Sequence, residues 1–204
     1  GVDVQQNAMF SIARHAKSIG KAAGVATNAK FYDATPGAFF TNNIDRENSN
    51  ELSRQAIIES NADVIIGCGH PEYDKNGQLR TTPDYDGLGG ETMLQDLRNS
   101  ATTYQVASNS GMTTVCDIDK DGTPDPWTFV EDSANLVKYM TGETPKRLFG
   151  LIPVESSMQF YRTGQNDLDS ARFDDWNPGM PRLWQIGRTA INCLSKNENG
   201  FFVM

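Results

Sequence analysis

The sequence predicts an α/β fold, with a mainly parallel sheet, helices on both faces and long loop insertions. Two patterns predict it. Segments with apolar residues at helical spacing alternate along the chain with short apolar runs, as in folds built from helices and parallel strands. Residues 63–67, Asp-Val-Ile-Ile-Gly, form one such run, which suits a strand buried on both faces. We expect residues 1–204 to form a single domain, because this length with 38% hydrophobic residues suffices for one sizeable core.

Each element is predicted from its own pattern. The first helix covers residues 10–19 and ends at Gly20, since glycine readily terminates a helix. The apolar run at residues 24–27 is the first strand. Helices and strands then alternate: helix 51–60, strand 63–67, helix 91–99, strand 103–107, helix 131–140, strand 148–152, helix 181–195 and strand 201–204. Pro181 suits the first turn of the last helix.

Two polar segments interrupt this alternation. Residues 71–90 are rich in Gly, Asp, Thr and Pro, and residues 153–180 contain few periodic apolar residues. We expect both to form long loops over the sheet. Loops of this length are uncommon in compact domains unless they have a function.

The composition argues against several classes of protein. A formal net charge of -8 argues against a nucleic-acid-binding surface, which needs basic residues. No apolar run approaches the roughly 20 residues of a membrane span, so none is expected. Cys68, Cys116 and Cys193 lie far apart without a CxxC motif, which fits neither a disulfide framework nor a zinc cluster. We expect buried thiols, although an oxidising compartment could pair two of them.

The most informative motif follows the predicted strand 24–27. Asp33-Ala-Thr35-Pro-Gly-Ala places a carboxylate and a hydroxyl two residues apart, and Arg46 follows. Oxygen ligands suit a hard cation, arginine suits a phosphate, and the carboxyl ends of strands in open α/β sheets bind ligands. The alternative is a turn that caps the next helix, with Arg46 solvated. Composition alone favours that alternative, because short polar motifs often occur by chance.

Resemblance to a known family favours the ligand site over the capping turn. The Asp-Ala-Thr-Pro motif, with Arg46 thirteen residues after Asp33, resembles the alkaline phosphatase family. Three other segments are similar to family strands in the same order: residues 61–69 (Asn-Ala-Asp-Val-Ile-Ile-Gly-Cys-Gly), 146–152 (Lys-Arg-Leu-Phe-Gly-Leu-Ile) and 194–204 (Leu-Ser-Lys-Asn-Glu-Asn-Gly-Phe-Phe-Val-Met). The resemblance spans nearly the whole chain and implies a three-layer sandwich.

The resemblance also implies a function. It implies a phosphomonoesterase that acts on phosphate monoesters through a phosphoserine intermediate with two Zn²⁺ ions and one Mg²⁺ ion. Asp33 and Thr35 would hold the Mg²⁺, and Arg46 would bind the phosphoryl group and act in catalysis. By the same resemblance, the protein would be periplasmic or secreted, and a homodimer is possible.

The resemblance implies that some functional parts lie outside these residues. The family's nucleophilic serine precedes the counterpart of Gly1, and its zinc ligands follow the counterpart of Met204. His15 and His70, the two histidines, have no spacing that suggests a zinc site. We therefore expect an interior fragment that is inactive alone, and the apolar end Phe-Phe-Val-Met agrees with a chain that continues.

A second acidic motif is independent of the family. Asp117, Asp119, Asp121 and Asp125 occupy positions 1, 3, 5 and 9 of a loop with glycine at position 6, the spacing of calcium-binding loops. Thr128 replaces the glutamate that an EF-hand has at position 12. We predict a structural Ca²⁺ site. The competing function is therefore a noncatalytic domain stabilised by calcium, in which a phosphatase-like sheet serves as a binding or structural module.

Three further features carry weaker predictions. His70 follows the end of a strand, where loops approach ligands, but a histidine in a turn is the simpler interpretation. Glu155, just after the strand 148–152, could bind a metal. Gly67-Cys68-Gly69 lacks the lysine and hydroxyl of a P-loop, so it gives little support for nucleotide binding.

Overall fold

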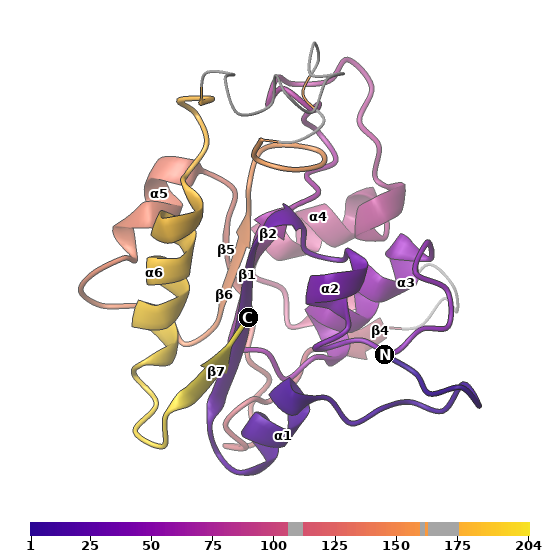
Figure 1. The fold of residues 1–204 in the computed structure, drawn as a ribbon, viewed down its shortest axis with the longest axis vertical. Helices are drawn as coiled ribbons and strands as arrows, with labels where there is room; N and C mark the ends of the chain where they lie inside the picture. Colours follow the sequence, from indigo (N-terminus) through magenta and orange to yellow (C-terminus); the bar gives the residue numbers. More distant parts are fainter. Residues whose placement is uncertain (106–111, 160–161, 163–175) are drawn as a thin grey trace.

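A five-stranded parallel sheet forms the centre of the molecule (Figure 1). The computed structural model describes residues 1–105, 112–159, 162 and 176–204. The strand order is β5-β6-β2-β1-β7, with β1 (Ala22–Lys30), β2 (Val64–Cys68), β5 (Thr128–Val130), β6 (Leu148–Leu151) and β7 (Phe201–Val203). Every neighbouring pair is parallel. All strands therefore end on one side, here called the carboxyl end of the sheet, and start at its amino end.

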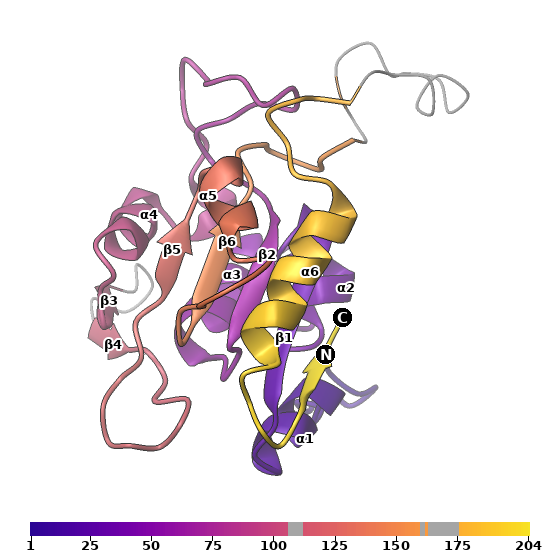
Figure 2. The same cartoon turned by 90° about the vertical axis from the view of Figure 1, so that its left-hand side faces the viewer.

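Helices cover both faces of this sheet (Figures 1 and 2). One face carries α5 (Ser133–Lys138) and α6 (Leu183–Leu194), and the other carries α2 (Ala34–Gly37), α3 (Ser49–Arg54) and α4 (Glu91–Arg98). A further helix, α1 (Ile12–Ser18), precedes β1. These layers confirm the predicted three-layer α/β fold.

The side chains of the strands alternate between two hydrophobic clusters. Ile65 of β2 belongs to the cluster under α3 and α4, whereas its neighbours Val64 and Ile66 belong to the cluster under α5 and α6. Successive side chains of a strand point to opposite faces. Both faces of β2 are therefore buried, and this is why its sequence is continuously apolar.

One predicted strand was placed in the wrong sheet. The strand expected at residues 103–107 is β3 (Thr103–Gln105), which pairs antiparallel with β4 (Met112–Thr114) in a separate sheet. Residues 106–107 lie outside the described residues. The chain returns to β4 after a connection much shorter than the dozen or so residues that a parallel crossover needs, so the pairing is antiparallel.

The remaining differences concern short elements. Strand β5 was not predicted, because three residues give no periodic signal. The predicted helix 51–60 is α3 followed by a wider π-helical turn over Gln55–Glu59. Segment 71–90 is a loop with one bridge between Tyr73 and Leu79 and one 3-10 turn at Asp86–Leu88. Of the predicted loop 153–180, residues 160–161 and 163–175 lie outside the described residues.

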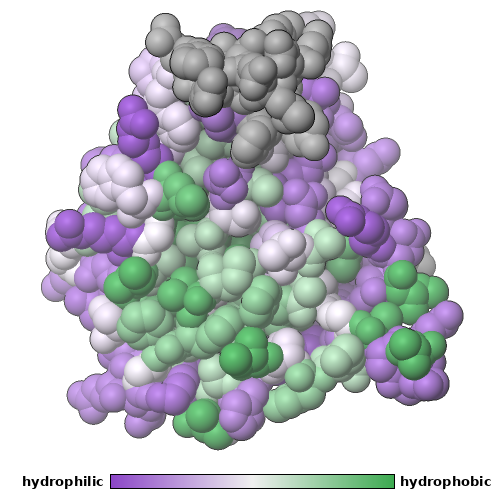
Figure 3. All heavy atoms as spheres, in the orientation of Figure 1, coloured by the Kyte–Doolittle hydropathy of each residue, from purple (hydrophilic) through white to green (hydrophobic). Residues whose placement is uncertain are grey.

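The face around the outer strand β7 is apolar in part. Figure 3 shows hydrophobic residues gathered in the middle of this view, and Phe39, Phe202 and Met204 are only partly buried there. The rings of Phe39 and Phe202 lie 5.5 Å apart. Within the described residues, no helix is long and apolar enough to cross a membrane.

Candidate active site

Strand β1 carries the first predicted site residue to the carboxyl end of the sheet. The Asp33 N–H donates to the Lys30 carbonyl at 3.1 Å, and the Gly37 N–H donates to the Asp33 carbonyl at 2.8 Å as α2 begins. Asp33 is thus the residue that precedes α2, but its carboxylate makes no capping hydrogen bond. The turn that the alternative interpretation predicted is present, and the side-chain cap is not.

The Asp33 carboxylate is available to a ligand. It is half-buried, and burial raises its pKa, while the nearby Lys30 ammonium acts in the opposite direction. No side-chain hydrogen bond or ion pair involves this carboxylate within the described residues. Thr35 lies in the single turn of α2 and is exposed. A partly buried charge without an ion-pair partner is costly, which makes Asp33 a candidate cation ligand.

Arg46 lies on the segment between α2 and α3. Its side chain is 70% exposed, and its Nε lies 3.2 Å from Oε1 of Glu47, which is 83% exposed. The positive charge of Arg46 is close enough to lower the pKa of Asp33. The fold therefore brings the predicted carboxylate and guanidinium to the same end of the sheet.

The sequence interpretation missed two neighbours of Asp33. Lys30 and Tyr32 line a small cavity of about 190 Å³, together with His70, Arg80 and Glu155 from the loops after β2 and β6. The Lys30 ammonium lies 5.7 Å from the centre of the Tyr32 ring, and Nη2 of Arg80 lies 2.5 Å from Oε2 of Glu155. The position of Lys30 and Tyr32, at the end of β1 and just after it, was the available signal.

Two glycines make room for the Tyr32 ring. A Cβ added to Gly69 would lie 2.8 Å from Tyr32 Cε1, and one added to Gly87 would lie 2.5 Å from Tyr32 Oη. Gly69 also has a φ of +106°, which other residues rarely adopt. Packing against Tyr32 therefore explains the glycine after Cys68.

His70 is buried in a network of ion pairs. Its Nε2 lies 3.0 Å from Glu131 Oε2, and its Nδ1 accepts a hydrogen bond from the Glu72 N–H at 3.2 Å. Arg98 bonds to both carboxylates, at 2.6 Å from Glu72 and 2.8 Å from Glu131. Burial alone would raise the pKa of Glu131, but the hydrogen bonds from His70 and Arg98 lower it to about 2.

The same three side chains meet the spacing of a metal site. One ligand atom each from His70, Glu72 and Glu131 lies within 4.8 Å of the others. However, the Arg98 guanidinium already forms ion pairs with both carboxylates. The arrangement is therefore an ion-paired link between the end of β5, α4 and the loop after β2.

The acidic loop lies at the opposite end of the sheet. Asp117 accepts hydrogen bonds from the Asp121 and Gly122 N–H groups, and the Ile118 N–H donates to the buried Asp125 carboxylate at 2.8 Å. Ligand atoms of Asp117, Asp119 and Asp125 lie within 4.8 Å of one another. The structure thus brings three of the four predicted carboxylates together, and Asp121 is not in this group.

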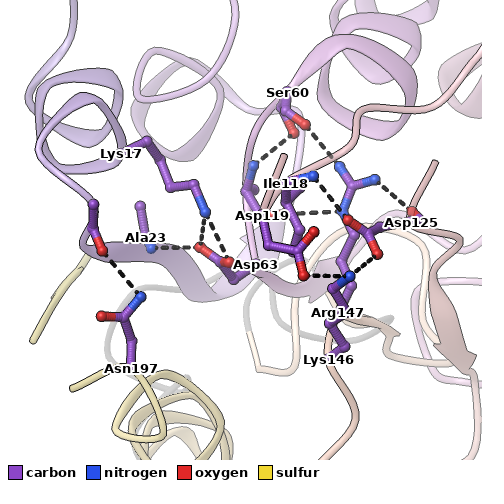
Figure 4. Close-up of polar contacts among 12 residues, drawn as sticks. Lys17, Ala23, Ser60, Asp63, Ile118, Asp119, Asp125, Lys146, Arg147 and Asn197 are labelled. Carbon is purple, nitrogen blue, oxygen red and sulfur yellow. Dashed lines mark hydrogen bonds and ion pairs between the residues drawn. The ribbon is translucent and has the colours of Figure 1, made fainter. Parts of the chain in front are cut away.

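A lysine ammonium lies among these carboxylates (Figure 4). Lys146 Nζ is 2.6 Å from Asp119, 2.5 Å from Asp125 and 3.7 Å from Asp121. A divalent cation in this loop would compete with that ammonium. This contact could not be predicted from local sequence patterns, because Lys146 is distant from the loop along the chain.

Comparison with known proteins identifies the family. The family model described as alkaline phosphatase matches residues 1–204. The chain belongs to the alkaline phosphatase family. It is 24% identical to the tissue-nonspecific alkaline phosphatase of Felis catus over 98% of this chain and 36% of that protein. It is also 24% identical to an alkaline phosphatase of Escherichia fergusonii, over 100% of this chain and 42% of that protein.

Solved alkaline phosphatases share the fold. The cold-active alkaline phosphatase of Shewanella sp. matches with a TM-score of 0.59 and 21% identity, over 99% of this chain and 36% of that one. The alkaline phosphatase of the Antarctic bacterium TAB5 matches with a TM-score of 0.51 and 20% identity, over 100% of this chain and 44% of that one. The chain thus spans well under half the length of these relatives.

Proposed function

We propose that the protein is a metal-dependent phosphomonoesterase in which Asp33 and Thr35 hold Mg²⁺ and Arg46 binds the phosphoryl group of the substrate. The observation that carries the proposal is the half-buried Asp33 carboxylate, which has no side-chain partner within the described residues and follows the end of β1. Carboxylate and hydroxyl oxygens suit Mg²⁺. A variant of the TAB5 enzyme has magnesium bound in its M3 site, which agrees with this choice of metal.

Each residue has a separate task in the proposal. Mg²⁺, when bound, would supply positive charge beside the reacting phosphate. Lys30 opposes the effect of burial on the pKa of Asp33, which burial raises. Arg46 offers two parallel N–H donors to phosphoryl oxygens and stabilises the charge that develops in the transition state. Its exposed contact with Glu47 is weak, so a phosphate can displace it.

The proposal extends the resemblance in three further respects. The phosphorylated serine and the zinc ligands would come from family segments that the resemblance places outside these 204 residues. The substrate would be a phosphate monoester. A homodimer and a periplasmic or secreted location complete the proposal.

The test measures hydrolysis of 4-nitrophenyl phosphate by the full-length protein. Arg46→Ala is expected to lower kcat/KM by about 10- to 150-fold, because a charged hydrogen-bonded contact is worth roughly 1.5–3 kcal/mol. Arg188→Ala, which removes an exposed arginine on α6, is the matched control. Asp33→Asn is expected to weaken the dependence of activity on Mg²⁺. Unchanged kcat/KM and phosphate inhibition in Arg46→Ala would contradict the role of Arg46.

The alternative is the noncatalytic domain stabilised by calcium. The clustered carboxylates of Asp117, Asp119 and Asp125 favour it. A full-length protein that responds to Ca²⁺ but hydrolyses no phosphate monoester would support this alternative. Hydrolysis at the same rate by residues 1–204 alone would instead contradict the proposed position of the nucleophile.

A further inference from the structure

A larger cavity lies at the amino end of the sheet, opposite the end that carries Asp33. Its volume is about 630 Å³, within the range of small-molecule sites. Residues near the starts of three strands line it, among them Lys21 before β1, Asp63 before β2 and Lys146 before β6. Residues around the end of α6, including Cys193 and Lys196, line another side. The proposed function uses none of these residues.

The charged lining of this cavity is mainly positive. Five of the eight lysines of the chain line it, although the net charge of the chain is -8. They are Lys17, Lys21, Lys120, Lys146 and Lys196. The acidic lining residues are Asp63 and Asp119. A cleft lined by one sign of charge concentrates the field and attracts ions of the opposite sign.

Each aspartate of the lining is paired with a lysine (Figure 4), and Lys146 is shared with Asp125 and Asp121, which lie outside the lining. Lys17 Nζ lies 2.8 Å from Oδ1 and 2.9 Å from Oδ2 of Asp63. Lys146 Nζ lies 2.6 Å from Asp119. Figure 4 shows the two ion pairs beside each other at the starts of the strands. The remaining lysines therefore give the cavity a positive excess.

Three lysines provide this excess. Lys120 and Lys196 are exposed and form no ion pair within the described residues. The Lys21 ammonium donates to the Asn199 carbonyl, which is uncharged. Lys120 also has a φ of +63°, a conformation that costs free energy in a residue other than glycine and is common at functional sites.

We propose that this lysine-lined cavity binds a small polyanion with at least three negative charges, carried by phosphoryl or carboxylate groups. Lysine ammonium groups are flexible point charges that contact separate oxyanions. Lys21, Lys120 and Lys196 come from three different segments of the chain. A ligand with several anionic groups can contact all three, whereas a singly charged anion cannot.

An alternative explanation accounts for only part of the charge. Lys17 lies in the last turn of α1 and Lys196 follows α6, so both complement the partial negative charge of helix carboxyl ends. Lys120 belongs to neither helix, since it lies on the acidic loop, although it lines the cavity together with Lys17 and Ser18 of α1. A loss of affinity in Lys120→Ala with an unchanged melting temperature would therefore distinguish a binding site from simple helix stabilisation.

The experiment uses two probes with the full-length protein. Methylenediphosphonate carries two phosphoryl groups on a P–C–P bridge that resists hydrolysis, and citrate carries three carboxylates. Calorimetry at an ionic strength of about 0.01 M, where screening is weak, measures Kd. Alkylation of Cys193, followed by peptide mass spectrometry, reports occupancy of the cavity itself. The two probes decide whether phosphoryl or carboxylate groups are preferred.

Charge-matched variants locate the binding. Lys120→Ala with Lys196→Ala removes two lining lysines, and Lys75→Ala with Lys138→Ala removes two exposed lysines outside the lining. We expect a Kd at least tenfold higher in the first pair, a change below twofold in the second, and slower Cys193 alkylation with a bound probe. Arg46→Ala should leave this protection intact, which separates the cavity from the proposed phosphoryl site.

Two results would overturn the proposal. One is the absence of Cys193 protection by either probe. The other is an equal loss of affinity in both lysine pairs, which would indicate attraction by surface charge in general. Melting temperatures of the free variants within about 2 °C of the parent would show that the pairs are equally folded. If they were not, the Lys120→Ala single variant, which changes no helical residue, would be measured in place of the pair.

Discussion

Charged side chains at the two ends of the sheet differ in how many partners they have, as a comparison of Arg147 with Asp33 and Arg46 shows. At the amino end, Arg147 is buried and donates to the carbonyls of Ser60, Ala62 and Asp125 at 2.7–3.0 Å. Its guanidinium also lies 3.7 Å from the centre of the Trp127 ring. At the carboxyl end, the Asp33 carboxylate has no side-chain partner within the described residues, and Arg46 makes one exposed contact.

This difference distinguishes a charged side chain that stabilises the fold from one that can bind a ligand. A buried ion is tolerated only when its hydrogen bonds are satisfied, as those of Arg147 are. An exposed pair such as Arg46 and Glu47 costs little to separate. The Arg147 hydrogen bonds therefore stabilise the fold, whereas Asp33 and Arg46 can exchange their contacts for a ligand.

The largest expected effect is a loss of stability when the hydrogen bonds of Arg147 at the amino end are removed. Arg147→Met is expected to lower the free energy of unfolding by about 3–5 kcal/mol, because each buried carbonyl left without a donor costs roughly 1–3 kcal/mol. Urea unfolding of the 204-residue chain would measure this, with Arg188→Met as the control. A loss below about 1 kcal/mol would show that water or a rearrangement replaces the guanidinium.

The next prediction tests how much the ionised Glu131 carboxylate, beside the carboxyl end, contributes to stability. The pKa of Glu131 is lowered from 4.5 to about 2 in the folded chain, so its contribution to stability is complete above about pH 4.5 and is lost as the pH falls toward 2. Allowing for partial exposure of the side chain, we expect Glu131→Gln to lower the free energy of unfolding by about 1–2 kcal/mol at neutral pH.

Urea unfolding of the parent and of Glu131→Gln at several pH values would check this. The difference between them should shrink as the pH falls through that window. Glu198→Gln, which changes an exposed glutamate, should show no such trend. A difference that does not depend on pH would mean that shape and hydrogen bonding, and not ionisation, determine the contribution of Glu131.

A smaller effect concerns the acidic loop. If Ca²⁺ binds there, added Ca²⁺ at about ten times its Kd should raise the melting temperature by about 3–6 °C, and Mg²⁺ should do less, because it demands a tighter octahedron. Lys146→Met should enlarge the response, since it removes the competing ammonium. Differential scanning calorimetry would measure these shifts.

The calcium response has its own matched control. Asp119→Ala with Asp121→Ala should abolish it, and Glu143→Ala with Glu198→Ala, which removes two exposed carboxylates elsewhere, should not. Equal melting temperatures with Ca²⁺ and with chelator in metal-free protein would leave Lys146 as the sole counter-ion of the loop.

The smallest expected effect concerns the ion pair between Arg46 and Glu47 at the carboxyl end. In the full-length protein, Glu47→Gln should free Arg46 and lower the inhibition constant of inorganic phosphate by about 1.4- to 5-fold, which corresponds to an exposed ion pair worth roughly 0.2–1 kcal/mol. In an Arg46→Ala background the same change should have no effect. An effect that persists in that background would mean that Glu47 acts on the phosphate directly.

The sequence by itself determined the fold class, the family and the candidates Asp33, Thr35 and Arg46. Periodicity and strand-end motifs are local patterns, and a continuous run such as residues 63–67 reports burial on both faces of a strand. The sequence did not determine that β3 pairs with β4 outside the main sheet. The three residues of β3 are too few for a pattern that would specify its partner. Its pairing depended instead on the short connection to β4.

Only the tertiary structure decided which charges meet. Lys146 lies beside Asp119, and Arg98 joins Glu72 to Glu131, although these partners are far apart in the chain. The lysines of the amino-end cavity likewise come from separate segments. Electrostatic interactions depend on distance in space, which the parallel topology sets by bringing all strand starts to one end of the sheet and all strand ends to the other.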